Sequence, residues 1–237
     1  MAHETYPQES KDNNGFTPLI QATDSNEQKI IDFLIEKNVN LLEEDSNGMT
    51  ALDHANNLET INTLTKHGAT YGSPFKALIN ALKSSYNEVV DYLLDNNLAN
   101  IEDKDEKGQT VLHIAAIYNN EKIDNLIVKG ADLNASDNSG YTPLIVAAQA
   151  YSYGMTDVVK SLLNHNPDLE AKDLDGMTAL HWAAKQGLPD VVVLLVEMKA
   201  NSEAIDNNGK TPLDLALERV DGDQSVVDCL TKARQSG

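Results

Sequence analysis

The sequence predicts an all-α fold, a repeat solenoid, and the main reason is an internal repeat. The segment Asp-x-x-Gly occurs six times, at Asp12, Asp45, Asp105, Asp137, Asp173 and Asp206. A threonine lies two residues after each of these glycines, and successive threonines (Thr17, Thr50, Thr110, Thr142, Thr178 and Thr211) are 33, 60, 32, 36 and 33 residues apart. The interval of 60 is almost two periods, and KALINALKSSYNEVVDYLLDNN, residues 76–97, fills it with a copy that lacks the Asp-x-x-Gly signature. Seven stacked copies are therefore expected.

Each copy is predicted to begin with a tight turn. The glycine stands where the turn needs a positive φ, which glycine adopts without strain. The aspartate can accept backbone hydrogen bonds across the same turn. One such aspartate in every copy is a structural rule and not an acid–base pair.

Two short helices are predicted to follow the turn. Threonine suits a helix N-cap and proline the first helical position, as in Thr17-Pro18, Thr142-Pro143 and Thr211-Pro212. In the fourth copy one apolar face on each helix is marked by Leu112, Ala115 and Ala116, then by Ile123, Leu126 and Ile127. The second helices are predicted to end at residues that tolerate a left-handed conformation, namely Asn38, Asn97, Gly130 and Asn166.

Residues 1–11 are expected to be an N-terminal extension and residues 12–237 a single repeat domain. The copies are placed near 12–44, 45–71, 72–104, 105–136, 137–172, 173–205 and 206–234. The second copy is short, because HGATYGSPF (67–75) leaves no room for a full turn segment before the next helix, so a change of curvature is predicted near 72–75. The fifth copy is three residues longer than the period of 33, and the charged seventh copy is typical of a terminal cap.

The best-formed copies closely resemble ankyrin repeats. The resemblance is carried by GQTVLHIAAIYNNEKIDNLIVKGADLNA (108–135) and GMTALHWAAKQGLPDVVVLLVEMKANSEA (176–204), and it extends from about Asp12 to Ala233. It implies a curved stack of helix pairs with a concave inner face and β-hairpin-like fingers at the junctions. It also implies that a partner lies across the finger tips and the first helices.

Composition narrows the range of partners. The 237 residues carry a formal net charge of −19, so nucleic acid and an anionic membrane surface are poor partners. A protein with a basic patch is more plausible, although the charge can simply keep an exposed surface soluble. With a single cysteine, Cys229, no signal peptide and no long apolar run, the chain is expected to be cytoplasmic, with a periplasmic or secreted location as the open alternative. It is also expected to be a monomer.

No catalytic, cofactor or metal site is predicted. His113 and His181 follow the repeat period and not a metal geometry, and the resemblance gives them a hydrogen-bonding role within and between copies. The sequences DKDEKG and DLDG lack the glutamate that a calcium loop needs six residues after its glycine. Cys229 lies on a predicted apolar helix face, which favours packing over nucleophilic use.

The candidate partner-binding surface consists of the residue before each cap threonine and the residues after the paired alanines. Two groups of side chains stand out in or near it: aromatic residues in copies four to six, and acidic residues in or beside the fingers. The aromatic group is Tyr118, Tyr141, Tyr151, Tyr153 and Trp182; the acidic group is Glu43, Glu44, Glu102, Asp103, Glu106, Asp168, Glu170, Asp175 and Glu203. Gln109, Met177, Lys185 and Gln186 complete the candidates.

Both groups have a second interpretation. Tyr and Trp are typical interface anchors, but Trp182 and Tyr118 can equally pack between neighbouring copies. The acidic residues can attract a basic partner or be no more than solvated fingers.

The expected function is a non-catalytic protein-binding module that holds a partner in the concave face of copies three to six. The alternative is an inhibitor or immunity-type protein that inserts Tyr151–Gly154 into an enzyme's active site. A secreted bacterial effector is a further possibility that nothing in the residues demonstrates.

Overall fold

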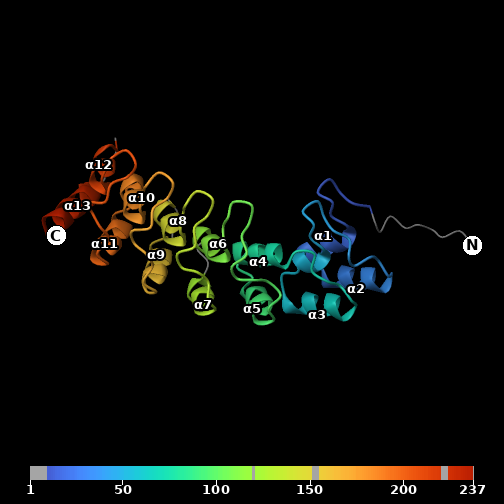
Figure 1. Ribbon diagram of the computed structural model, residues 1–237. Coiled ribbons are helices and arrows are strands. Elements are labelled where there is room, and N and C mark those ends of the chain that lie inside the picture. Colours follow the sequence, from blue (N-terminus) through green and yellow to red (C-terminus); the bar gives the residue numbers. More distant parts are fainter. Residues whose placement is uncertain (1–9, 119–120, 151–154, 220–223, 237) are drawn as a thin grey trace, which may run out of the picture. The chain divides into compact units, whose positions relative to one another are not determined.

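The structure is a computed structural model that describes residues 10–118, 121–150, 155–219 and 224–236 (Figure 1). It comprises two compact units, residues 1–100 and 101–237. The boundary between them falls inside the third copy, which lacks the Asp-x-x-Gly turn.

The first unit contains three helix pairs. They are α1 (Pro18–Asp24) with α2 (Gln28–Glu36), η2 (Ala51–His54) with α3 (Leu58–Lys66), and α4 (Pro74–Lys83) with α5 (Asn87–Asp95). The core lies between the pairs, and Ile20, Leu64, Leu78 and Leu93 have no exposed surface. The first helix of the second copy is a single 3-10 turn of four residues, shorter than the helices of the other copies.

The second unit contains four helix pairs. They are α6 (Val111–Ile117) with α7 (Ile123–Val128), α8 (Pro143–Gln149) with α9 (Met155–Leu163), α10 (Ala179–Gln186) with α11 (Pro189–Glu197), and α12 (Pro212–Leu217) with α13 (Gln224–Ser236). The first helices pack in the order α6, α8, α10, α12, and the second helices in the order α7, α9, α11, α13. Loops project beside the first helices at each junction (Figure 1).

The predicted fold class is confirmed, because the regular secondary structure of the described residues is helical and these residues contain no strand. The fingers are present as hydrogen-bonded turns and not as paired strands. In each finger the aspartate N–H donates to the carbonyl four residues later, as Asp137 does to Tyr141 at 2.9 Å.

Helix boundaries agree with the residues that predicted them. The hydroxyls of Thr17 and Thr142 accept hydrogen bonds from the backbone three residues later, at 3.2 and 3.3 Å, and a proline begins each of these helices. Positive φ values end the second helices at the expected places, which are Asn38, Asn97, Gly130 and Asn166.

The short junction after the second copy is closed by one buried aspartate. Asp53 is 2% exposed and accepts hydrogen bonds from the backbone N–H groups of Thr50 (2.7 Å), Gly72 (2.7 Å) and Ser73 (2.9 Å). A carboxylate with three such donors can be buried at low cost. Asp53 therefore fixes the start of the third copy where a finger is missing. The change of curvature near 72–75 stays a prediction.

Candidate functional site

The fingers are held by the aspartates of their turns. In copy five, Asp137 Oδ1 accepts hydrogen bonds from the backbone N–H groups of Ser139 (2.8 Å) and Tyr141 (2.9 Å). Gly140 closes the turn with a φ of +80°. The same pair of hydrogen bonds recurs at Asp12, Asp45, Asp105, Asp173 and Asp206. These contacts confirm the structural role that was predicted for the aspartates.

Two buried histidines, one on α6 and one on α10, each join a first helix to the finger of the next copy. His113 Nδ1 accepts from the Thr110 N–H (3.2 Å), and Nε2 donates to the Tyr141 carbonyl oxygen (2.8 Å). His181 repeats the arrangement with Thr178 N–H (3.2 Å) and the Lys210 carbonyl (3.1 Å). A carbonyl oxygen only accepts, so the proton of each neutral ring is on Nε2. Burial lowers the pKa of both histidines, which favours this neutral form.

Further contacts between copies use residues close to the turns. Lys104 Nζ donates to the Ser136 carbonyl oxygen (2.9 Å), and Lys172 Nζ donates to the Ile205 carbonyl oxygen (2.8 Å). Both lysines stand directly before a turn aspartate and reach the equivalent position of the next copy. This role of the lysines was not predicted from the sequence, although Lys11, Lys104 and Lys172 share the same place in the repeat.

Several of the acidic candidates also hold the backbone or pair with a cation. Glu102 Oε1 accepts from the Asp132 N–H and Glu170 Oε1 from the Asn201 N–H, both at 2.8 Å. Asp168 Oδ1 accepts from Glu170 N–H at 2.9 Å. Glu43 and Glu203 form ion pairs with Lys11 (2.8 Å) and Arg234 (3.0 Å). The other four acidic candidates are exposed, and within the described residues their carboxylates have no such contact; they are Glu44, Asp103, Glu106 and Asp175.

An aromatic pair spans copies five and six. The rings of Tyr141 and Trp182 meet edge to face, with 5.8 Å between centroids and 90° between planes. Lys185 Nζ lies 4.6 Å from the Trp182 ring centroid. Burial raises the pKa of Tyr141, and the carboxylates of Asp173, Asp175 and Asp137 raise it further. Both rings are half-buried, so each has a packing contact and an accessible part.

The indole nitrogen of Trp182 has its own partner. Nε1 donates to Asp173 Oδ2 at 2.7 Å, and Asp173 is only 6% exposed. In copy two the residue at the same position, His54, places Nε2 3.0 Å from Asp45 Oδ2. Trp182 therefore stabilises the turn of its own copy through this hydrogen bond, while part of its ring stays accessible at the surface. A nitrogen-bearing ring nine residues after the turn aspartate was the sequence signal for this contact.

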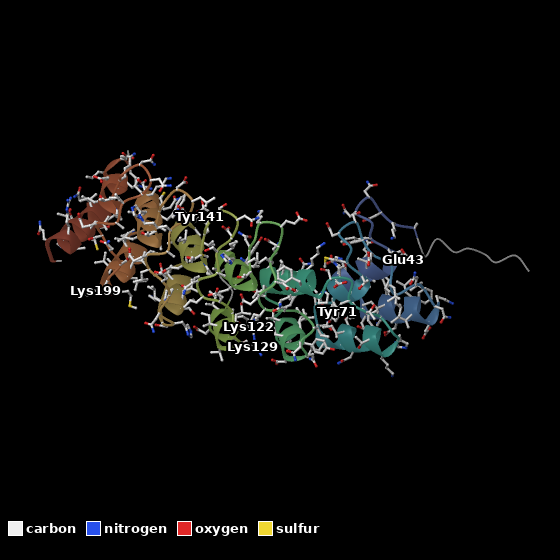
Figure 2. The ribbon with its side chains drawn as sticks, viewed as in Figure 1. Glu43, Tyr71, Lys122, Lys129, Tyr141 and Lys199 are labelled. Atoms are coloured by element: carbon white, nitrogen blue, oxygen red, sulfur yellow. The ribbon has the colours of Figure 1, made fainter. Side chains whose placement is uncertain are left out.

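The remaining candidates are distributed around these rings. Tyr118 follows α6 and is 47% exposed, and Lys185 is exposed at the end of α10. Gln109 and Gln186 are half-buried. Tyr151 and Tyr153 lie outside the described residues. Figure 2 shows Tyr141 on the finger side of the second unit, and Lys129 at the other side, after α7.

The expectation that Met177 lies on the surface is wrong. Its side chain is 3% exposed, and Met49, at the same position in copy two, is 4% exposed. The residue before the cap threonine thus points into the stack when it is a long aliphatic side chain, because burying it removes apolar surface from water. A polar or aromatic residue at this position, such as Gln109 or Tyr141, stays partly accessible.

A groove of about 420 Å³ lies between the fingers of copies four and five. Its lining includes Gln109, Ile117, Tyr141, Val146 and Gln149, together with the carboxylates of Glu106 and Asp137. Gln109, Tyr141 and Glu106 were predicted as candidates, so the structure brings part of the candidate site together here.

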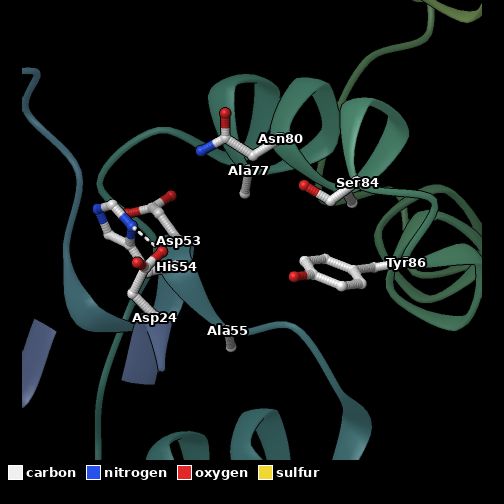
Figure 3. A pocket seen from close by; sticks show the side chains of 9 residues that line it. Asp24, Asp53, His54, Ala55, Ala77, Asn80, Ser84 and Tyr86 are labelled. Atoms are coloured by element: carbon white, nitrogen blue, oxygen red, sulfur yellow. Dashed lines mark ion pairs between the residues drawn. The ribbon is translucent and has the colours of Figure 1, made fainter. Parts of the chain in front are cut away.

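A smaller pocket of about 260 Å³ lies in the first unit. His54 Nδ1 is 3.5 Å from Asp24 Oδ1 at its edge, and Asn80, Ser84 and Tyr86 line the opposite side (Figure 3). Both ring nitrogens of His54 therefore face carboxylates, Nδ1 that of Asp24 and Nε2 that of Asp45. Within the described residues no group of three or more histidines, cysteines or acidic residues is arranged to hold a metal ion.

Cys229 lies on α13, one of the second helices. It is half-buried, and burial raises the pKa of its thiol. It lines a depression of about 750 Å³ between α11 and α13. A raised thiol pKa disfavours the nucleophilic thiolate.

Comparison with known families agrees with this architecture. The family model described as "Ankyrin repeats (3 copies)" matches residues 2–75, 56–137, 78–173 and 144–236. The chain belongs to the ankyrin-repeat family. Ankyrin repeats are an interaction fold that is typically non-catalytic and binds other proteins.

The curated relatives of this ankyrin-repeat chain include Notch homologues. It is 34% identical over 153 residues to neurogenic locus notch homolog protein 1 of Homo sapiens, which covers 63% of this chain and 6% of the relative. The Danio rerio homologue is 31% identical over 207 residues, 85% of this chain and 8% of the relative. The Xenopus tropicalis homologue is 36% identical over 114 residues, 47% of this chain and 4% of the relative. The chain thus spans less than a tenth of the length of these proteins.

No ankyrin helix in the described part of the chain is both long and apolar enough to cross a membrane.

Proposed function

We propose that this chain is a non-catalytic module that binds a partner protein through the inner face of its second unit. The inner face consists of the finger turns of copies four to six and the adjoining sides of α6, α8 and α10. It contains the candidates Gln109, Tyr118, Tyr141, Trp182 and Lys185.

The observation that supports this location best is the array of partly accessible rings beside the groove. Tyr141 and Trp182 are held rigidly by their edge-to-face contact, and Trp182 is fixed again by its hydrogen bond to Asp173. Rigid aromatic side chains lose little entropy when they bind, and they offer a large contact area. Tyr118 adds an exposed ring at the end of α6.

Charge supports a partner with a basic surface. Asp103, Glu106 and Asp175 are exposed along the fingers, and the chain as a whole carries −19. Like charges along one edge speed the approach of a cationic partner. We expect the association rate to fall steeply as salt is added, while the dissociation rate changes little.

Capture from a cell extract of the source organism tests the location. The variant Gln109→Ala/Tyr118→Ser/Lys185→Ala changes three accessible side chains of the inner face and leaves Tyr141 and Trp182 in place. The control Val128→Ser/Lys160→Ala/Val193→Ser changes three exposed positions on the second helices of the same copies.

The first variant should lose the proteins that the parent chain retains, and the control should keep them. Equal loss in both variants, or in neither, would place the binding surface elsewhere. Circular dichroism on both variants checks that the helices are intact.

A further inference from the structure

The turn aspartates differ in the hydrogen-bond donor that reaches one of their two carboxylate oxygens, Oδ2. In every finger Oδ1 accepts the two backbone hydrogen bonds, so Oδ2 is left for another donor. In copy six that donor is Trp182 Nε1, 2.7 Å from Asp173 Oδ2. In copy two it is His54 Nε2, 3.0 Å from Asp45 Oδ2. Both donors are N–H groups on flat rings, and both come from the residue nine positions after the aspartate.

Copy five lacks this ring donor, as do copies one, four and seven, where the corresponding residues are Gln21, Ile114 and Leu215. The residue nine positions after Asp137 is Val146, whose side chain has no N–H. Among the residues that the structure describes, no side-chain donor reaches Asp137 Oδ2; its contacts are the two backbone bonds of Oδ1. Asp137 is half-buried, and it lines the groove of about 420 Å³ together with Val146.

The rest of the groove matches one kind of side chain. Ile117, Val146 and the Tyr141 ring provide apolar wall, and Glu106 adds a second carboxylate. Lys107 is the one cationic side chain in the lining that the structure describes. A flat cation with an apolar stem fits such a site, because its stem packs on aliphatic carbons while its N–H groups face the carboxylates.

We propose that this groove binds an arginine side chain of the partner protein, and that the guanidinium donates to Asp137 Oδ2 in place of the missing internal donor. The proposal rests on the proposed function and specifies the chemistry of the partner. Arginine is chosen over lysine because its planar N–H groups reproduce the flat donors of Trp182 and His54 and can also lie against the Tyr141 ring. The ring of Trp182 already carries a cation, since Lys185 Nζ lies 4.6 Å from its centroid.

The test uses the full chain and a defined probe. The peptide acetyl-Gly-Arg-Gly-amide is titrated into isotope-labelled protein, and the methyl signals of Ile117 and Val146 are followed by NMR. Two matched peptides replace arginine by lysine or by citrulline, which keeps the shape and loses the charge. The arginine peptide should shift these methyl signals saturably and bind more tightly than either analogue.

Three variants locate the contact. Asp137→Asn keeps Oδ1 for the turn and replaces Oδ2, and it should weaken arginine binding roughly tenfold, the effect of one charge-assisted hydrogen bond. Asp105→Asn makes the same change in the finger of copy four, outside the groove lining, and should leave binding unchanged. Val146→Trp copies the arrangement of α10, supplies the donor internally and should abolish binding, which is followed in this variant by the Ile117 methyl signals alone.

Equal shifts with arginine and citrulline, or an undiminished affinity in Asp137→Asn, would overturn the proposal. The outcome is separate from that of the capture experiment. If the peptide fails to bind and the Gln109→Ala/Tyr118→Ser/Lys185→Ala variant still loses its partner, the arginine site is wrong and the proposed function stands. If the peptide binds as expected and that variant keeps its partner, the proposed function is wrong and the site stands.

Discussion

His113 Nε2 lies 2.8 Å from the carbonyl oxygen of Tyr141, so the first helix of copy four is hydrogen-bonded to the finger of copy five. His181 makes the corresponding bond to Lys210 at 3.1 Å. Both rings have no exposed surface, and both act as neutral donors. The stability of the stack is therefore tied to the protonation of two buried histidines.

Stability should fall with acidification because of these two groups. Burial lowers the pKa of His113 and His181 from 6.5, so below that pH these histidines bind protons more readily in the unfolded chain than in the folded chain. The two histidines make their full contribution to the free energy of unfolding above about pH 6.5. As the pH falls below that value, this contribution declines by up to about 1.4 kcal/mol per pH unit for each histidine. Urea unfolding of the parent and of His113→Gln/His181→Gln measures the slope. The variant should be less stable near neutrality but less sensitive to pH, whereas His67→Gln, at an exposed position, should follow the parent.

The indole N–H of Trp182 should contribute to stability separately from its ring. Trp182→Phe keeps an aromatic side chain but leaves the buried Oδ2 of Asp173 without its donor. An unsatisfied buried group costs about 1–3 kcal/mol, and chemical denaturation should show a loss of this size. Trp182→His introduces the residue that copy two uses at this position, and part of the loss should be recovered. If phenylalanine and tryptophan give equal stability, the hydrogen bond has no energetic role.

Two turn glycines should differ in their tolerance of a side chain. Gly140 has a φ of +80°, and an added Cβ would lie 3.0 Å from Asp173 Cα and 3.0 Å from Leu174 N in the next finger. Gly209 has a similar φ of +76°, but nothing lies within 4 Å of its Cβ position. Gly209→Ala should cost only the backbone strain, about 1–2 kcal/mol. Gly140→Ala should cost about 1–3 kcal/mol more, because backbone atoms must move. Equal thermal shifts would mean that the contact between these fingers is loose.

Residues 101–237 should fold without the first unit. They form one compact unit with four helix pairs, and arrays of three or more repeats can bury a continuous core. The expressed fragment should show helical circular dichroism, cooperative unfolding and the same Trp182 fluorescence as the full chain. A fragment that is unfolded or aggregates would contradict this prediction and show that residues 101–237 need the first unit in order to fold.

Most of the architecture was predictable because each signal is local and repeats. Thr142 and Pro143 define a helix start through contacts within one turn, and Gly130 defines a helix end in the same way. The period then places the remaining copies without knowledge of their contacts. The exception is the second copy, where the helix is a single 3-10 turn and Asp53 reaches across to Gly72 and Ser73.

The candidate site was less predictable because exposure depends on neighbouring copies. Met177 and Tyr141 occupy the same position in successive copies, yet one is 3% exposed and the other is half-buried. Likewise, nothing in Glu102 or Glu170 alone shows that the next copy offers each of them a backbone N–H. Distances between copies decide these cases, and a single sequence contains no record of them.

Adjacent fingers are also linked through the main chain alone. Asn138 donates to the Lys107 carbonyl, Leu174 to that of Ser139, and Asn207 to that of Asp175, at 2.9, 3.1 and 2.9 Å. Such links do not depend on which side chains are present. Within copies four to seven, loss or duplication of an entire copy would leave each remaining finger facing an equivalent strip of backbone. Evolution can therefore change the number of these copies in whole steps, while the side chains on their accessible face diverge independently.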